Sequence, residues 1–546
     1  MAIVLIDQRE IEIGDDEHLN GIEAAERAGI EIPHYCWHPG LSVAGSCRMC
    51  LVEMGTRDPG TGEISMLPKL VPACKTRATD GIVFVTNSEK VQRARAMVEE
   101  DLLLRHPIDC PICDKAGECS LQDYHFKYGR DRRRADIRPF TSRRREVGPE
   151  ITLFVDRCVQ CTRCVRFTRE ISGTSELFLS GRGADGEIAV MPGFPLNNKL
   201  SGNVVDLCPV GALGDKDFLY QQRVWFLERH AAVCTGCATG CSIWIEENED
   251  RVWRVKPREN PHVNHWWICN DGRYGYSHVH DSRRLTVPRR RDGDSAAVVD
   301  WTGLPELLKS RLRESGRLAA VLSPFLTVEE AYLLAKFVRQ LDPQAQLALG
   351  PVPTVGEDEE FGNQFSISAE KCPNRLGVEQ VIAHFTGQVI TFEQFLDELE
   401  EGSIKAAWVS GGYKSDWIDE PTARKFSGLE MLVVQDLFAS PLSQLATFEL
   451  PGAAPAERAG SYVNRADRLQ SIRRAVRPPG GVRVEGSLYW DLLAMQGLYN
   501  APAALDEVIE RIGYFAAAAP GVPESGIDLK VNLLADSGGL DKLDQA

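Results

Sequence analysis

The hydrophobic pattern changes along this chain of 546 residues, and the changes divide it into segments. The first residues, through Ile13, soon alternate apolar with acidic positions, which is typical of a strand. Residues 21–29 then show a helical pattern that Gly29 would end. Apolar positions recur at helical spacing within 90–105, although the stripe that begins at Val91 is imperfect. We therefore expect short strands around one helix, followed by a second helix.

After residue 286 the sequence changes character. Uninterrupted apolar runs, which are typical of buried strands, alternate with helical patterns such as residues 328–338. This alternation predicts a parallel α/β domain. The strand-like runs are residues 317–322, 405–411 and 429–434. The tail from Ala516 is rich in Ala, Gly and Pro, and we expect it to be mobile.

Composition narrows the classes of protein. A net charge of −16 argues against general nucleic-acid binding, because phosphate contacts need a basic surface. No run of about 18 apolar residues appears, so we expect no membrane-spanning segment. The first residues lack the basic region of a signal peptide, and we expect a reducing compartment.

Cysteines are the strongest chemical signal in the sequence. Fifteen of the sixteen cysteines fall into four groups at ligand-like spacing, and adding His106 makes sixteen candidate ligands for four sites. A disulfide framework is the alternative, but such frameworks belong to small secreted domains. Iron–sulfur clusters need this crowding, because each takes four protein ligands and a C-x-x-C turn pre-positions two of them. Only Cys372 is left over.

The first two groups differ in their ligand types. The first, C-x10-C-x2-C-x23-C, resembles a [2Fe-2S] ferredoxin of the β-grasp type, with a longer first spacer than the plant-type C-x4-C. Gly and Ser before Cys47 would let backbone amides approach the sulfur atoms. The second group, a predicted [4Fe-4S] site, replaces one thiolate by a neutral imidazole, which should raise its reduction potential. The predicted ligands are Cys36, Cys47, Cys50 and Cys74 for the first site, and His106, Cys110, Cys113 and Cys119 for the second.

The third and fourth groups each predict a [4Fe-4S] cluster. The third begins as C-x2-C-x2-C, but Thr168 stands where a bacterial ferredoxin has its next cysteine, and the Cys-Pro ending of that signature comes only at Cys208. The fourth reads C-x2-C-x3-C-x27-C. Structural zinc is the alternative for the first and fourth groups. The predicted ligands are Cys158, Cys161, Cys164 and Cys208, then Cys234, Cys237, Cys241 and Cys269.

Two further motifs need interpretation. Residues 181–186 match G-x-G-x-x-G, but the extended sequence after them predicts a turn between strands and not a dinucleotide site. The basic run formed by residues 130–134 and 143–145 is either a solvated face or a docking surface for an acidic partner.

The order of the four groups resembles the G subunits of bacterial NADH-quinone oxidoreductases, the respiratory complex I, over residues 1 to about 285. The resemblance implies an iron-sulfur electron-transfer subunit with one [2Fe-2S] and three [4Fe-4S] clusters and no complete active site. In that family, electrons pass from the NADH/FMN module toward membrane quinone, coupled in the whole complex to proton translocation. The cluster matching the fourth group is regarded as off the main path.

Partners and location follow from the same resemblance. It implies contact with the flavin/NADH-binding subunit and with the peripheral-arm subunits that lead to quinone. The chain would lie on the cytoplasmic side of the bacterial inner membrane as a peripheral protein, touching the membrane only through partners and binding no nucleic acid.

The expected fold class is multidomain, α+β and α/β. The expected domains are a [2Fe-2S] ferredoxin-type domain over 1–85, a domain ligated by one histidine and three cysteines over 86–126, a ferredoxin-like [4Fe-4S] domain over 147–225, a [4Fe-4S] domain of the molybdopterin-oxidoreductase type over 226–285, and an α/β domain over 286–546. Residues 455–470 are similar to a segment of molybdopterin oxidoreductases. Too few residues follow Cys269 for all the cofactor-binding domains of those enzymes, so we expect a cofactor-free scaffold.

Three other interpretations remain open. A molybdenum-holding, formate dehydrogenase-like catalytic subunit is favoured by the position of Cys372, although no histidine stands beside it. An electron-transfer subunit of an NAD-linked hydrogenase matches residues 1 to about 220 but does not explain the fourth group. The last alternative is a zinc-stabilised interaction scaffold.

Overall fold

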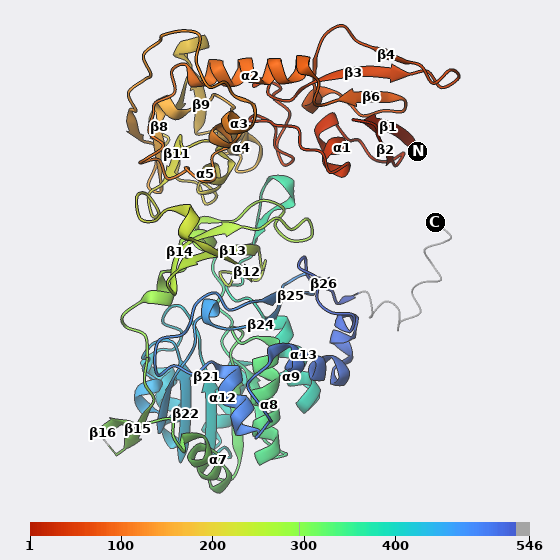
Figure 1. Ribbon diagram of the computed structural model, residues 1–546. Coiled ribbons are helices and arrows are strands. Elements are labelled where there is room, and N and C mark those ends of the chain that lie inside the picture. The colour runs from red at the N-terminus through yellow and green to blue at the C-terminus, as the bar shows by residue number, and fades with distance from the viewer. Residues whose placement is uncertain (294, 531–546) are drawn as a thin grey trace. The chain divides into compact units, whose positions relative to one another are not determined.

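The computed structural model describes residues 1–293 and 295–530 (Figure 1). These residues form two compact units. The first holds residues 1–227 together with 361–363, and the second holds 228–360 and the chain from 364 onward. Within the described residues, no helix is both long enough and apolar enough to cross a membrane.

The first unit begins with a mixed sheet that has one helix against it. Its strands run in the order β2-β1-β6-β3-β4, β5 pairs with β3, and the pairing of β1 with β6 is parallel. Val4, Ile22 and Phe84 are fully buried between the sheet and α1. The elements are β1 (Ala2–Ile6), β2 (Arg9–Ile13), α1 (Gly21–Arg27), β3 (Leu51–Arg57), β4 (Ile64–Met66), β5 (Val71–Pro72) and β6 (Ile82–Val85).

Local sequence explains where these elements start and stop. Asp7 and Gln8 both have positive φ and turn the predicted first strand into the hairpin β1–β2, as a two-residue turn of this handedness requires. Asn20 caps α1 in a reciprocal capping box with Glu23. Gly29, at φ +69°, lies just beyond the helix, so the predicted stop is confirmed.

The predicted second helix is confirmed as α2 (Glu89–Leu103), but its buried face is not the apolar stripe expected from the sequence. Met97 is 51% exposed, whereas Arg95 and Glu99 are buried in line with Val91. Polar partners in the surrounding fold explain the difference. The Tyr35 hydroxyl donates a hydrogen bond to Glu99, and the Arg95 guanidinium lies 5.1 Å from the centre of the Tyr128 ring.

The rest of the first unit is built from short elements. Strand β8 lies between β11 and β7 in an antiparallel sheet, and β9 pairs with β10 across residues 181–186, so the predicted turn between strands is confirmed there. The elements are α3 (Ser120–Tyr128), β7 (Arg144–Glu146), β8 (Ile151–Phe154), α4 (Arg163–Glu170), β9 (Leu177–Ser180), β10 (Glu187–Val190), α5 (Asn203–Leu207) and β11 (Leu213–Asp215).

The second unit opens with an antiparallel sheet in the order β12-β13-β14. Its strands are β12 (Glu228–Val233), β13 (Ser242–Asn248) and β14 (Arg251–Pro257). The short helix α6 (Asn270–Tyr274) follows, with Cys269 as its N-cap.

A seven-stranded sheet in the order β16-β15-β23-β22-β21-β17-β18 dominates the second unit. The five strands from β23 to β18 are parallel to one another, so the predicted parallel α/β domain is confirmed. The strands are β15 (Arg289–Asp292), β16 (Ser295–Val298), β17 (Leu318–Leu322), β18 (Gln346–Leu349), β21 (Ala406–Ser410), β22 (Met431–Asp436) and β23 (Phe448–Pro451).

Helices cover both faces of this sheet (Figure 1). Alternate residues of β17 enter different cores, because successive side chains of a strand point to opposite faces. Ala320 packs with α7, α8, α9, α12 and α13, whereas Val321 packs with α10. The helices are α7 (Leu304–Glu314), α8 (Val328–Leu341), α9 (Arg375–Thr386), α10 (Phe392–Glu400), α11 (Glu420–Arg424), α12 (Glu485–Leu492) and α13 (Ala501–Arg511).

Aromatic side chains fill the point where the strand order reverses. The chain leaves β17 for β18 on one side and later returns to β21 on the other, which is where open α/β sheets usually bind ligands. In the loops after β17 and β21, the rings of Phe325 and Tyr413 lie 5.0 Å apart, and Tyr413 stacks on Trp417 at 4.9 Å. Cys372 is fully buried against Phe325 and Tyr413.

The expectation of a mobile tail from Ala516 was wrong for the described part. Strand β26 (Ile527–Asp528) pairs with β25 (Arg468–Ile472), which also pairs with β24 (Gly460–Val463). Leu529 is fully buried, so apolar packing and strand pairing outweigh the Ala, Gly and Pro content. Residues 531–546 lie outside the described residues. Two short strands, β19 (Glu359–Glu360) and β20 (Ser366–Ile367), complete the unit.

Candidate metal centres

All sixteen cysteines lie in the described residues, and none forms a disulfide. Of the sixteen predicted ligands, Cys110 is exposed, while His106, Cys47, Cys119 and Cys158 are partly buried. The other eleven are buried. Free thiols gathered in the interior are suited to metal binding, because thiolate is the form that binds and burial protects the site from water.

The structure brings the four cysteines of the first group together between β3, β5 and the loop before β3. The four thiols shift one another's pKa values in opposite directions. The pKa values of Cys36 and Cys50 are lowered by neighbouring thiols, whereas those of Cys47 and Cys74 are raised by them. The sulfur atoms therefore lie close to one another, as a shared [2Fe-2S] site would require.

The second group follows α2. Burial, reinforced by the positive charge of Arg157, lowers the pKa of His106 to about 4, so the imidazole is neutral and able to act as a ligand. The same arginine acts on Cys113, whose charge also interacts with those of Cys110 and Cys119. Burial raises the pKa of Cys119 to about 11. An iron centre in this group would offset that cost, because metal binding stabilises the thiolate.

The four cysteines of the third group line one cavity at the start of α4, with Cys208 entering from the end of α5. Burial and the neighbouring sulfur atoms raise the pKa of Cys158 and Cys164. Thr168 is absent from the lining and is fully buried within α4, where its carbonyl accepts hydrogen bonds from the following turn. The structure thus brings Cys208, and not Thr168, to the other three.

Strained backbone shapes the cysteine loops. Arg48, Gln160 and Thr162 lie between ligands and have positive φ values of 62°, 50° and 61°. Non-glycine residues seldom adopt this conformation, and successive amides in it form concave anion-binding nests. The amide of Gln160 donates to Cys158 Sγ at 3.3 Å, so the loop is preorganised around its sulfur atoms.

The fourth group is buried throughout. The amide of Cys234 donates to the carbonyl of Cys241 at 2.8 Å, which closes the loop that carries the first three cysteines. Backbone amides of Gly236 and Gly272 donate to Cys234 Sγ and Cys269 Sγ at 3.4 and 3.3 Å. Burial and the charges of Cys234 and Cys237 raise the pKa of Cys269 to about 12.

Three of the four groups are neighbours within the first unit. Arg166 on α4 donates to the carbonyl oxygens of Cys36 and Cys161, which belong to the first and third groups. A side chain at Gly211, three residues after Cys208, would place its Cβ 2.1 Å from Cys113 Sγ of the second group. The third group therefore adjoins both the first and the second.

Sequence reasoning missed Arg166, and it missed Lys414 beside the fourth group. Lys414 follows β21 and lines a cavity together with Cys234. Lys414 lies far along the chain from the cysteines beside it, and Arg166, which closely follows Cys164, lies 130 residues from Cys36. Neither is part of a spacing motif. A basic residue at the end of an apolar strand run was the one available signal for Lys414.

The basic run forms ion pairs within its own unit. Arg130 and Arg134 both contact Glu100, and Arg143 contacts Asp156 at 2.7 Å. Arg145 pairs with Glu187 at 2.9 Å. Carboxylates of the same unit therefore offset much of the positive charge of the basic run.

Cys372 is embedded in the second unit. Its thiol donates to Glu370 Oε1 at 3.4 Å, and burial raises its pKa. The thiol is thus enclosed by aromatic rings and hydrogen-bonded to a carboxylate.

Five family models match successive segments of the chain. Residues 3–89 match a 2Fe-2S iron-sulfur cluster binding domain, 95–134 the NADH-ubiquinone oxidoreductase-G iron-sulfur binding region, and 148–214 the ferredoxin-like domain of NADH-quinone oxidoreductase subunit 3. Residues 227–281 match the molybdopterin oxidoreductase Fe4S4 domain, and 385–493 match molybdopterin oxidoreductase. The predicted fold class is thereby confirmed.

Whole-chain comparison gives relatives of one kind. The G subunit of the NADH-quinone oxidoreductase of Rickettsia felis is 34% identical over 338 residues, which are 62% of this chain and 48% of the relative. Over these residues the chain is similar to the G subunits of NADH-quinone oxidoreductases. Another relative, the mitochondrial NADH-ubiquinone oxidoreductase 78 kDa subunit of Candida albicans, is 35% identical over 344 residues, covering 62% of this chain and 46% of that one. The 75 kDa subunit of Reclinomonas americana is 36% identical over 344 residues, covering 62% and 48%.

The chain spans about half the length of these relatives. Among solved structures, a chain of an NAD+-reducing [NiFe]-hydrogenase in the H2-reduced state is similar, at 29% identity and a TM-score of 0.35. That match covers 41% of this chain and 91% of the hydrogenase chain.

Proposed function

We propose that this chain is an iron-sulfur electron-transfer subunit of an NADH:quinone oxidoreductase. It would hold one [2Fe-2S] cluster in the first group and one [4Fe-4S] cluster in each of the other three. The observation that carries the proposal is the presence of four separate gatherings of unbridged cysteines in a relative of the G subunits. Bound clusters would supply one-electron transfer.

The chain's own residues serve this role by holding the groups close together. Arg166 fixes the backbone of the first group against that of the third, and Gly211 allows the third to touch the second. We propose that electrons pass through the first unit from the first group to the third and then to the second. Burial keeps water away from the sulfur atoms, and the amides aimed at them stabilise negative charge.

Two-electron chemistry would belong to partners. We propose the flavin/NADH-binding subunit as donor and the peripheral-arm subunits leading to quinone as acceptors. Proton translocation would then be a property of the whole complex. The chain would be peripheral on the cytoplasmic side of a bacterial inner membrane and would contact the membrane through those partners.

The α/β part of the second unit is proposed as a scaffold without a molybdenum cofactor. Phe325 and Tyr413 occupy the place where the strand order reverses, so a pterin would have to displace packed rings. The same rings enclose Cys372, which also argues against the molybdenum-holding interpretation.

Elemental analysis of the anaerobically purified full chain tests the proposal. One [2Fe-2S] and three [4Fe-4S] clusters predict about 14 iron atoms per chain and no molybdenum, tungsten or stoichiometric zinc. Molybdenum or tungsten in stoichiometric amount would instead indicate a catalytic subunit, and zinc in place of iron would end the redox interpretation.

A pair of variants tests the least regular ligand assignment. Cys208→Ser should lose about four iron atoms and one electron paramagnetic resonance (EPR) signal, because the third group loses a ligand. Thr168→Ala is the matched control and should keep both. Iron loss from Thr168→Ala but not from Cys208→Ser would refute the assignment.

A further inference from the structure

Lys414 is held rigidly at the carboxyl edge of the parallel sheet. The amide of Gly412, two residues earlier, donates to Asp436 Oδ1 at 2.8 Å. The hydroxyl of Tyr413 donates to the carbonyl of Pro351, also at 2.8 Å. Because both neighbours are fixed, the lysine leaves the sheet in a defined direction.

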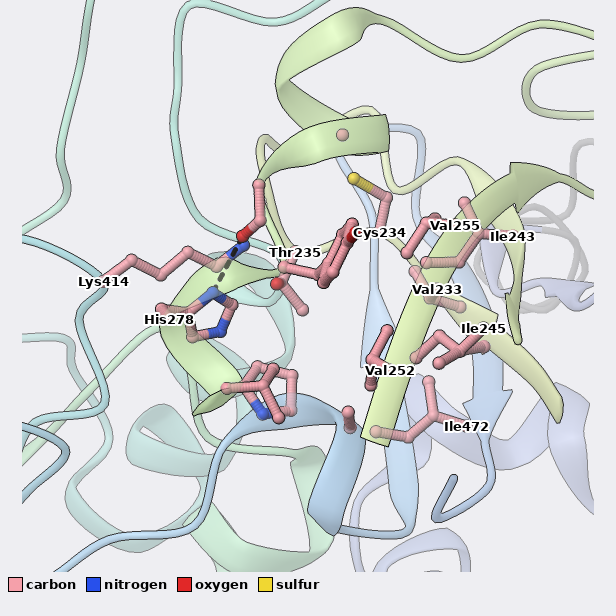
Figure 2. A pocket seen from close by; sticks show the side chains of 17 residues that line it. Val233, Cys234, Thr235, Ile243, Ile245, Val252, Val255, His278, Lys414 and Ile472 are labelled. Atoms are coloured by element: carbon pink, nitrogen blue, oxygen red, sulfur yellow. Dashed lines mark hydrogen bonds between the residues drawn. The ribbon is translucent and has the colours of Figure 1, made fainter. Parts of the chain in front are cut away.

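The Lys414 side chain extends past His278 into a mostly apolar cavity that Cys234 and Thr235 also line (Figure 2). Val233, Ile243 and Val255 form much of its wall. Within the described chain, no hydrogen bond and no ion pair with a carboxylate engages the Lys414 ammonium. Lys414 is partly buried. A cation partly enclosed by apolar side chains is stabilised by an anionic partner, because losing hydration without one costs solvation free energy.

The charges around Lys414 indicate what that partner is. Burial lowers the pKa of its amine, while Cys234, Cys237 and Cys269 act in the opposite direction, followed by Asp271. Burial raises the pKa of Cys234, and the charge of Lys414 partly opposes this rise. Three of the four cysteines of the fourth group are thus within electrostatic reach of one ammonium.

His278 does not add a second positive charge beside the fourth group. Burial and the charge of Lys414 lower the pKa of His278 to about 3, so its ring is neutral near pH 7. Its Nδ1 atom is hydrogen-bonded to the carbonyl of Gly275 at 2.8 Å. Among the described residues that line the cavity, Lys414 therefore supplies the positive charge.

The α/β part of the second unit also forms hydrogen bonds with the loop that carries Cys234, Cys237 and Cys241. The amide of Ala238 donates to the Glu370 carbonyl at 2.9 Å, and the Arg465 amide donates to the Ala238 carbonyl at 2.8 Å. Gln470 Nε2 donates to the carbonyl of Gly240 at 2.8 Å. These contacts join the cysteine loop to the α/β part of the unit, from which Lys414 also extends.

We propose that Lys414 is a positioning residue that acts as the built-in counter-charge of the fourth centre and raises its reduction potential. The inference rests on the proposed [4Fe-4S] cluster in that group. Each added electron makes a four-thiolate cluster more negative, so a fixed cation stabilises the reduced state more than the oxidised one. The α/β scaffold thereby contributes to redox chemistry without a cofactor of its own.

An EPR-monitored redox titration of the iron-loaded full chain tests this role. The variants are Lys414→Met, which keeps length without charge, and Lys414→Arg, which keeps charge. Lys425→Met removes an exposed lysine paired with Glu400 and is the control. Cys234→Ala identifies the signal of the fourth centre by its loss.

In Lys414→Met, the ratio of reduced to oxidised fourth centre at a fixed potential should fall about tenfold, which equals about 59 mV for one electron. Lys414→Arg and Lys425→Met should match the parent chain, and the other three signals should not move. Loss of the fourth cluster from Lys414→Met alone would also support the proposal, since charge would then be needed to retain it.

Two results would overturn the inference. One is a fully loaded Lys414→Met chain with the parent potential. The other is loss of the fourth cluster from both Lys414→Met and Lys414→Arg, which would make side-chain shape the cause. A parent chain that itself lacks about four iron atoms, with no signal sensitive to Cys234→Ala, would refute the proposed cluster instead.

Discussion

The guanidinium of Arg166 donates a hydrogen bond to the carbonyl oxygen of Cys36, 130 residues earlier in the sequence. The same side chain reaches the carbonyls of Cys161 and Ser42. Buried carbonyl groups that lose a charged donor retain their desolvation cost. The first and third groups therefore depend on one residue.

Replacing this arginine should affect both groups together. We expect Arg166→Met to destabilise the first unit by about 3 kcal/mol, because a charged donor to three carbonyls is removed. The EPR signals of the first and third centres should broaden or decrease in parallel. Arg169→Met, an exposed neighbour paired with Glu170, should leave both signals unchanged. A change confined to one centre would contradict a shared support.

Adding a side chain at Gly211 should cause a selective loss of the second centre. A Cβ atom at this position would lie 2.1 Å from Cys113 Sγ, which is far closer than non-bonded atoms approach. Gly211→Ala should therefore displace Cys113 and reduce the iron content by up to about four atoms. Gly428→Ala, where no atom lies within 4 Å of the added Cβ, is the control. An unchanged iron content in Gly211→Ala would show that Cys113 can move away from the added methyl group without loss of the cluster.

His106 predicts a change in potential without loss of the cluster. His106→Cys would add one thiolate charge to the second centre, and this should lower its potential by at least about 59 mV, a tenfold change in equilibrium. Redox titration of the variant measures the shift, and the other three centres serve as internal controls. An unchanged potential with the cluster present would refute the charge argument.

The buried carboxyl group of Glu329 should make the free energy of unfolding depend on pH. Burial raises the pKa of its carboxyl to about 7 from an ordinary value of 4.5, against hydrogen bonds from Ser461. The folded chain thus holds this proton more tightly than the unfolded chain, so stability falls as pH rises from about 4.5 to 7 and then levels.

Glu329→Gln should remove this decline. Between pH 5 and pH 8 the variant should gain about 2 to 3 kcal/mol relative to the parent chain. Calorimetric unfolding at the two pH values measures the difference. Exposed Glu393→Gln should follow the parent curve. Equal pH dependence in Glu329→Gln and the parent would mean that another group dominates this range.

The sequence alone was sufficient where chemistry depends on spacing. The C-x-x-C turns placed most candidate ligands, and the Cys-Pro pair identified Cys208 although Thr168 occupies the regular position. Uninterrupted apolar runs likewise predicted β17, β21 and β22, because a strand buried on both faces needs little but apolar side chains.

Spacing could not reveal supports that come from distant elements. Arg166 and Lys414 acquire their roles from packing, which the local pattern does not encode. The same limit explains α2, whose buried Arg95 and Glu99 resemble surface residues in the sequence. Only the partners Tyr35 and Tyr128 make their burial favourable.

This polar inner face of α2 also affects how the molecule can be divided and how it assembles. Burying the side of α2 that carries Arg95 and Glu99 is unfavourable without polar partners. A fragment ending before residue 86 would leave the Tyr35 hydroxyl without its acceptor, Glu99. Tyr35 stands next to Cys36, so docking of α2 also supports the segment that carries the first candidate ligand. A shortened chain without α2 would keep all four cysteines of the first group and still lose this support.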